Sequence, residues 1–141
     1  MTSFLIKYTS MRRILFFLPA AIYYALLFYF SHRSYEFEID MPHFDKGIHF
    51  LEFAGLAILI FFGYFKSFGI TIKIKAVFTF ITATILAISD EIHHYFVPGR
   101  ESDILDVAAD VGGIIFGLFL FWYFTRRAKL KFLAENSSKK T

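Results

Sequence analysis

The sequence predicts an all-α integral membrane protein, a bundle of four transmembrane helices with both termini in the cytoplasm. Three observations support this fold class. Of the 141 residues, 57% are hydrophobic, whereas soluble domains usually contain about 45–50% apolar residues. The apolar residues come in long uncharged blocks, and the basic residues gather before the first block, between the second and third, and after the fourth. We expect a single membrane domain over residues 1–141, and a chain without cysteine has no disulfide or thiolate site.

The uncharged blocks set the positions of the predicted helices. They cover residues 14–31, 53–65, 76–89 and 111–125. A helix needs about 20 mostly apolar residues, at about 1.5 Å each, to cross the hydrocarbon core of a bilayer. The first block is long enough alone, and the others reach that length only with the polar residues beside them. We therefore predict helices at 13–31, 45–65, 74–97 and 103–125.

The ends of these helices carry further signals. Pro19 predicts a kink in the first helix, and Pro98-Gly99 is a turn signal that ends the third. The basic start also resembles a signal peptide, but the apolar run is longer than a signal-peptide core and no small-x-small cleavage site follows it. We expect an uncleaved first helix. Residues 128–141 are predicted to form a basic cytoplasmic tail, a frayed helix end on the anionic inner leaflet followed by disorder.

The distribution of basic residues predicts the orientation in the membrane. Twelve of the fifteen lie in the three segments that would share one side: Lys7, Arg12, Arg13, Lys66, Lys73, Lys75, Arg126, Arg127, Lys129, Lys131, Lys139 and Lys140. Only Arg33, Lys46 and Arg100 lie on the other side. Positively charged loops stay in the cytoplasm, so both termini are expected inside. The net charge of +3 is then a signal of topology, and we expect no nucleic-acid partner.

Ionisable residues that interrupt the apolar pattern are predicted to lie at one depth. Glu52, Asp90 and Asp110 lie fourteen to sixteen residues from the inner basic residue of their own helix. At about 1.5 Å per residue they would lie about 21 to 24 Å above the inner surface, within a core about 30 Å thick. Carboxylates at this depth are costly and normally pair or line a wet cavity. The sequence therefore predicts a polar pocket open to the outside, roofed by the Pro98-Gly99-Arg100 turn.

Helical spacing predicts that these groups face one another. Three stripes result, formed by Asp45, His49 and Glu52; by Asp90 and His94 with Glu91 beside them; and by Asp103, Asp106 and Asp110. The third stripe continues into Gly113 and Gly117, a small-xxx-small seam that lets backbones approach closely. The candidate site residues are Glu52, Asp90, Glu91, His94, Arg100, Asp106 and Asp110, with Asp45, Lys46 and His49 at the rim.

Simpler roles for these residues also stay open. Asp103 is expected to be the N-cap of the fourth helix, and Lys46 would extend to the interface. His43 and His93 are expected to be interfacial or packing residues. The whole set would also serve as a network that only holds three helices together, but this alternative leaves several carboxylates with few cations.

Two segments also carry a family resemblance. They are DKGIHFLEFAGLAIL, residues 45–59, and SDEIHHYFVPGRESDILDVAADVGGIIFG, residues 89–117. Over roughly residues 14–125, the chain resembles the VanZ family, whose pattern is Asp-Lys-x-x-His, Asp-Glu-x-x-Gln, Pro-Gly-Arg and Asp-x-x-x-Asn/Asp-x-x-Gly. The matching residues are Asp45, Lys46, His49, Asp90, Glu91, Pro98, Gly99, Arg100, Asp106, Asp110 and Gly113. One departure is that His94 stands where the family pattern has glutamine.

The resemblance implies a multi-pass protein of the bacterial cytoplasmic membrane and a place in the cell envelope. The family is named for a teicoplanin-resistance determinant, so the resemblance also implies an influence on glycopeptide resistance. It supplies no reaction.

Three functions stay open at this point. The first is a non-catalytic envelope protein that changes how glycopeptides meet the cell surface. The second is a membrane-embedded hydrolase or transferase acting on an envelope lipid or a lipid-linked cell-wall precursor. Its general base would be Glu52, Asp90 or Glu91, while Arg100 and Lys46 would hold a phosphate or carboxylate. The third is a proton- or cation-coupled carrier, against which the uncharged inner halves of the helices argue.

A divalent metal is the one cofactor that the residues suggest. His49, Glu52, Asp90 and His94 come from two helices and are chemically suitable ligands for zinc or manganese. The sequence contains no HExxH motif. The expected partner of the chain is the lipid bilayer, and the oligomeric state is left open.

Overall fold

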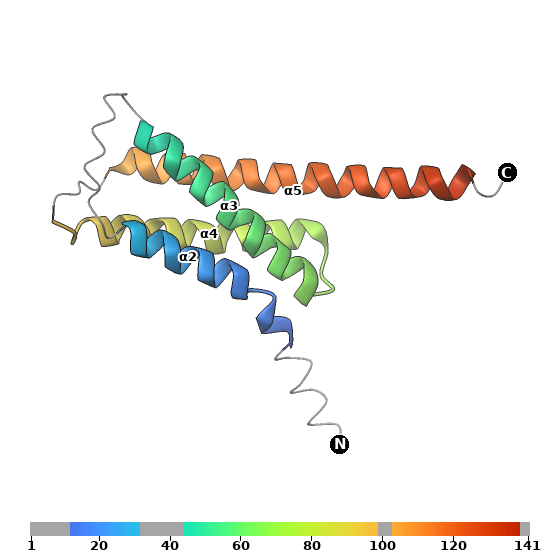
Figure 1. Ribbon diagram of the computed structural model, residues 1–141, viewed down its shortest axis with the longest axis horizontal. Helices are drawn as coiled ribbons and strands as arrows, with labels where there is room; N and C mark the ends of the chain where they lie inside the picture. The colour runs from blue at the N-terminus through green and yellow to red at the C-terminus, as the bar shows by residue number, and fades with distance from the viewer. Residues whose placement is uncertain (1–11, 32–43, 99–102, 139–141) are drawn as a thin grey trace, which may run out of the picture.

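The computed structural model describes residues 12–31, 44–98 and 103–138, and this part of the chain is helical without strands. Its helices are α2 (Leu18–Ser31), α3 (Phe44–Ser67), α4 (Ile72–His94) and α5 (Ile104–Ser138). They coincide with the four predicted ranges, with differences at the ends. Successive helices run in opposite directions, so that the end of α4 lies beside the starts of α3 and α5 (Figure 1).

Three of these helices are long and apolar enough to cross a membrane. They are α3, α4 and the part of α5 up to Ala128, while α2 is a shorter apolar helix. Many large apolar side chains point outward, among them Ile85 at 60% exposed and Ile115 at 55% exposed. Outward-facing isoleucines on spans of this length suit a hydrocarbon surrounding. The described chain is therefore a membrane helical bundle.

The first predicted helix, 13–31, is interrupted near its start. Residues 12–15 are helical, and the backbone N–H of Phe17 then donates to the carbonyl of Ile14 at 2.9 Å, a tight three-residue turn. The α-helix resumes at Leu18. Pro19 explains the break, because it has no N–H and its ring clashes with the carbonyl four residues earlier. The predicted kink is confirmed, and it shortens the continuous helix to 14 residues.

Helix α3 forms the centre of the bundle and packs most extensively against α5. The apolar core joins side chains of all four helices: Ala20, Phe53, Leu56, Ala57, Ile60, Ala83, Ala87 and Ile114. The glycine seam makes the contact between α3 and α5 close. A Cβ built on Gly113 would overlap the carbonyl oxygen of Phe50, and one built on Gly117 would overlap that of Ala54. The predicted small-xxx-small seam is confirmed.

The two later helices differ from the prediction at their C-terminal ends. Helix α4 ends at His94, where the N–H of Val97 donates to the His94 carbonyl at 3.0 Å in a tightened turn before Pro98. Helix α5 continues to Ser138, past the predicted end at 125. The prediction of disorder after a frayed end was therefore wrong as far as Ser138, because residues 126–138 contain neither glycine nor proline and favour a helix. Figure 1 shows this part of α5 extending past the other helices.

Candidate functional site

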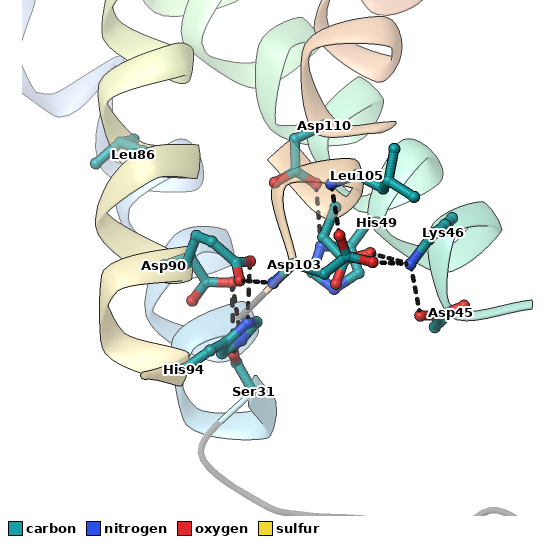
Figure 2. Close-up of polar contacts among 12 residues, drawn as sticks. Ser31, Asp45, Lys46, His49, Leu86, Asp90, His94, Asp103, Leu105 and Asp110 are labelled. Carbon is teal, nitrogen blue, oxygen red and sulfur yellow. Dashed lines mark hydrogen bonds and ion pairs between the residues drawn. The ribbon is translucent and has the colours of Figure 1, made fainter. Parts of the chain in front are cut away.

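Ionisable side chains of α3, α4 and α5 gather at one end of the bundle, beside the end of α2 (Figure 2). They are buried although they are polar: His49, Asp90, Glu91, His94, Asp106 and Asp110. Asp110 and His94 are each only 1% exposed. These side chains lie on the inward face of each helix, near the start of α3, the end of α4 and the start of α5, and these three helix ends meet at the same end of the bundle. The predicted inward facing of the acidic stripe of α5 is thus confirmed.

Lys46 occupies the outer part of this polar cluster. Its Nζ lies 3.1 Å from Oδ2 of Asp45 and 2.9 Å from carboxylate oxygens of both Asp103 and Asp106. An ammonium has three N–H donors, so three carboxylates occupy all of them. The donors of Lys46 are therefore all engaged by carboxylates of the chain itself. Lys46 ties the first turn of α3 to the first turn of α5.

His49 makes the deepest link between α3 and α5. Its Nδ1 lies 3.1 Å from Oδ1 of Asp110, and both side chains are buried. Glu52, three residues further along α3, is half-buried and lies within electrostatic range of His49. The two residues therefore share one face of α3, as the spacing predicts.

His94 is the centre of a second group, at the end of α4. Its Nδ1 lies 3.3 Å from Oε2 of Glu91, and its Nε2 lies 3.5 Å from Oδ2 of Asp90. The hydroxyl of Ser31, the last residue of α2, lies within hydrogen-bonding distance of Nε2 of the same ring and 3.4 Å from Oδ2 of Asp90. Its single proton serves one of these two acceptors at a time. Figure 2 shows Ser31 and His94 pointing toward each other from α2 and α4.

The two groups contact each other at two points. The rings of His49 and His94 meet edge to face, with centroids 5.8 Å apart. Oε1 of Glu91 accepts a hydrogen bond from the backbone N–H of Asp103 at 2.6 Å, just before α5 begins. Asp103 in turn accepts from the N–H of Leu105 through its own carboxylate, at 2.9 Å. Asp103 is therefore the predicted N-cap of α5 and a member of the polar cluster at the same time.

Asp90 has one oxygen that the cluster does not use. Oδ1 is buried and has no hydrogen-bond partner in the described part of the chain, although Asp90 is only 5% exposed. Such an atom in a buried carboxylate costs free energy unless a donor reaches it. The described cluster also contains seven carboxylates: Asp45, Glu52, Asp90, Glu91, Asp103, Asp106 and Asp110. Lys46 and two histidines do not balance them, so the cluster has spare capacity to accept hydrogen bonds or positive charge.

Most of the predicted site residues lie in this cluster, with three qualifications. Arg100 lies outside the described residues, as does His43. The described residues, which include the suggested ligands His49, Glu52, Asp90 and His94, contain no group of three or more His, Cys, Asp or Glu side chains arranged to hold a metal ion. One cavity among the described residues, of about 440 Å³, is an apolar groove between α2 and α3, lined by residues such as Leu18, Ile22 and Leu59.

Ser31 is the site residue that sequence reasoning missed. It ends an uncharged block and carries no periodic signal, so the sequence marks it only as the boundary of the first predicted helix. Its one distinguishing sign in the sequence is its expected depth in the membrane, counted along the helix from the inner basic residues. It lies eighteen residues after Arg13, about 27 Å at 1.5 Å per residue, which is close to the height of the acidic residues.

The polar residues above lie within a region of similarity to a known protein family. No curated protein and no solved structure shows significant sequence similarity to the chain. A model of the VanZ/LLP1 family matches residues 2–126, which include α2, α3, α4 and all of the polar residues above. The chain therefore belongs to the VanZ/LLP1 family.

Proposed function

We propose that the chain is an envelope protein of the bacterial cytoplasmic membrane whose polar cluster faces outward and binds a ligand rich in hydrogen-bond donors. We further propose that this binding influences tolerance of glycopeptides of the teicoplanin type. The outward orientation follows from the twelve-to-three division of basic residues. The link to glycopeptides follows from membership of the family.

The observation that carries the proposal is the unused oxygen of Asp90. Oδ1 is buried without a partner among the described residues, while the adjacent Oδ2 lies 3.4 Å from the Ser31 hydroxyl. A network that only joins helices would gain by pairing both oxygens. An unpaired buried acceptor inside the polar cluster is instead suited to a hydroxyl or ammonium group of a ligand that enters the cluster.

A second candidate function is a membrane-embedded enzyme, a hydrolase or transferase acting on an envelope lipid or a lipid-linked cell-wall precursor. The pairing of each histidine with a carboxylate favours it, because His49 meets Asp110 and His94 meets Glu91. A carboxylate partner fixes the orientation of an imidazole and raises its strength as a base. A proton-coupled carrier has less support, because the core below the cluster is apolar.

The test replaces Asp90 in a strain that depends on the chain for teicoplanin tolerance. We expect Asp90→Asn to remove the tolerance while the abundance and melting temperature of the protein stay near those of wild type, because the amide keeps the shape and loses an acceptor. Ser89→Asn is the matched control, since Ser89 is the exposed neighbour on the same helix. Loss of tolerance in parallel with loss of folded protein would contradict the proposal and favour a purely structural network.

A further inference from the structure

Ser31, His94 and Glu91 form a continuous chain of a hydroxyl, an imidazole and a carboxylate. The Ser31 hydroxyl is hydrogen-bonded to Nε2 of His94, and Nδ1 of the same ring lies 3.3 Å from Oε2 of Glu91. The two interactions use opposite nitrogens of the ring, as a nucleophile and an orienting carboxylate must. Figure 2 shows the Ser31–His94 pair where α2 ends beside α4.

We propose that Ser31 is the nucleophile of an acyl-transfer reaction, with His94 as its general base and Glu91 as the residue that positions His94. The inference deepens the enzymatic form of the proposed function, because it uses the same polar cluster. It names a reaction and a nucleophile that the family pattern does not contain, since that pattern has glutamine where His94 stands.

The position of Glu91 makes the imidazole a competent base. Oε1 of Glu91 is held by the backbone N–H of Asp103 at 2.6 Å, so Oε2 is left to accept the proton on Nδ1 of His94. This arrangement directs the lone pair of Nε2 toward the Ser31 hydroxyl. When His94 takes the proton it becomes an imidazolium between Glu91 and Asp90, whose Oδ2 lies 3.5 Å from Nε2. Both carboxylates stabilise that positive charge.

The reaction has two balanced steps. The Ser31 oxygen attacks the carbonyl carbon of an ester while its proton passes to His94, and the proton then moves to the departing alkoxide, which leaves as an alcohol. The product is an acyl ester on Ser31. A water molecule, or a second alcohol, attacks this ester with His94 again accepting the proton. The acid or the new ester leaves, and the proton returns to the oxygen of Ser31.

The position of Ser31 indicates a lipid ester as the substrate. Ser31 is the last residue of α2 and lies in the polar cluster, whose carboxylates are expected about 21 to 24 Å above the inner surface of a hydrocarbon core about 30 Å thick. The ester groups of a lipid lie at the edge of this core because they join its acyl chains to its polar head. Ser31 is partly exposed whereas His94 and Glu91 are buried, so the nucleophile is the accessible member. The unpaired Oδ1 of Asp90 would accept a hydroxyl of the same lipid head.

The test uses the full chain in lipid nanodiscs and a biotinylated fluorophosphonate, which reacts covalently with activated serines. We expect an adduct that peptide mass spectrometry places on Ser31 and that is absent in Ser31→Ala. His94→Gln restores the family residue and should fold, but an amide is not a base at neutral pH. We expect it to lower the labelling rate by about 10²-fold or more. Ser89→Ala, which removes an exposed serine one turn below His94, should be labelled at the wild-type rate.

An unlabelled Ser31 in folded wild-type protein, or equal labelling rates for wild type and His94→Gln, would overturn the assignment. The two proposals fail separately. If Asp90→Asn abolishes teicoplanin tolerance while wild-type protein forms no adduct, the ligand-binding function stands and the acyl transfer is wrong. If the adduct forms and depends on His94 while Asp90→Asn leaves tolerance unchanged, the acyl transfer stands and the link to glycopeptides is wrong.

Discussion

Lys46 shows how a single residue controls the outer part of the polar cluster. It is the one lysine in the described part of the cluster, and it meets three carboxylates within 3.1 Å. The side chain of Asp106 is only 9% exposed, whereas that of Asp45 is 58% exposed. The bond to Asp106 therefore contributes most, because solvent screens the exposed pair.

We expect Lys46→Met to lower the free energy of unfolding by about 1–3 kcal/mol, because it leaves Asp106 buried without its cation. Adding Asp106→Asn should recover part of the loss. Lys73→Met is the control, since Lys73 is exposed at the start of α4, and it should change the stability by no more than about 0.5 kcal/mol. Thermal unfolding in detergent measures all of these variants. Equal melting temperatures for the two lysine variants would show that Lys46 is not a structural tie.

At the residue scale, the sequence predicted where the site side chains lie but not which of them contact each other. The depth and facing of Asp90, His94 and Asp110 follow from counting residues along regular helices. The individual contacts between atoms do not follow from this counting, because a carboxylate at the right height reaches several partners with small changes of rotamer. Ser31 was missed for the related reason that a short polar side chain at a helix end is common and carries no pattern.

At the scale of elements, the glycine seam fixes how closely α3 and α5 cross. Gly113 faces the backbone of Phe50, while Gly112 faces only its ring, whose nearest atoms would be 3.5 Å from an added Cβ. The two neighbouring glycines therefore form a matched pair for experiment.

We expect Gly113→Ala to destabilise the protein by about 1–3 kcal/mol, because a backbone cannot move aside as a side chain can. Gly112→Ala should be neutral or stabilising, since alanine favours a helix over glycine by about 1 kcal/mol. The check is the melting temperature of each variant beside wild type, together with the teicoplanin phenotype. The seam would be refuted if Gly112→Ala proved the more harmful change.

Helix positions were predictable because uncharged blocks of 13 to 18 residues, which reach about 20 residues with the polar residues beside them, have few uses outside a membrane. The ends of the helices were less predictable than their positions. Pro19 indicated a kink, but a proline alone does not tell whether the helix bends or breaks, and here it breaks one turn earlier. The end of α5 was placed at 125 because the polarity changes there, whereas the helix continues to Ser138. Hydropathy marks where a membrane ends, and backbone preference decides where a helix ends.

At the scale of the whole molecule, charge and aromatic residues distinguish the two ends of the bundle. The polar cluster occupies one end. At the other, the guanidinium groups of Arg126 and Arg127 lie over the rings of Trp122 and Tyr123, at 5.3 and 5.1 Å from their centroids. Rings paired with cations are typical of a membrane interface. This end carries the basic majority that the sequence predicts to be cytoplasmic.

The orientation predicts the outcome of reporter fusions. Fusions after residues 36 and 101 should report the outside, and fusions after residues 70 and 135 should report the cytoplasm, because positively charged segments are retained inside. A pair of reporters active on opposite sides, such as alkaline phosphatase and green fluorescent protein, measures each site twice. One site with the reversed result would refute the four-span topology, and reversal of all four would place the polar cluster in the cytoplasm.

The carboxylate of Glu91 has two simultaneous duties, since one oxygen holds the backbone at the start of α5 and the other holds His94. Because both interactions use the same carboxylate, the contact with the start of α5 and the contact with His94 are coupled. A ligand that draws His94 away from Glu91 would loosen the hold of Glu91 on the start of α5, and by reciprocity a displaced start of α5 would loosen the hold of Glu91 on His94. Asp103, just before α5, and His94, at the end of α4, are therefore coupled through the one carboxylate of Glu91.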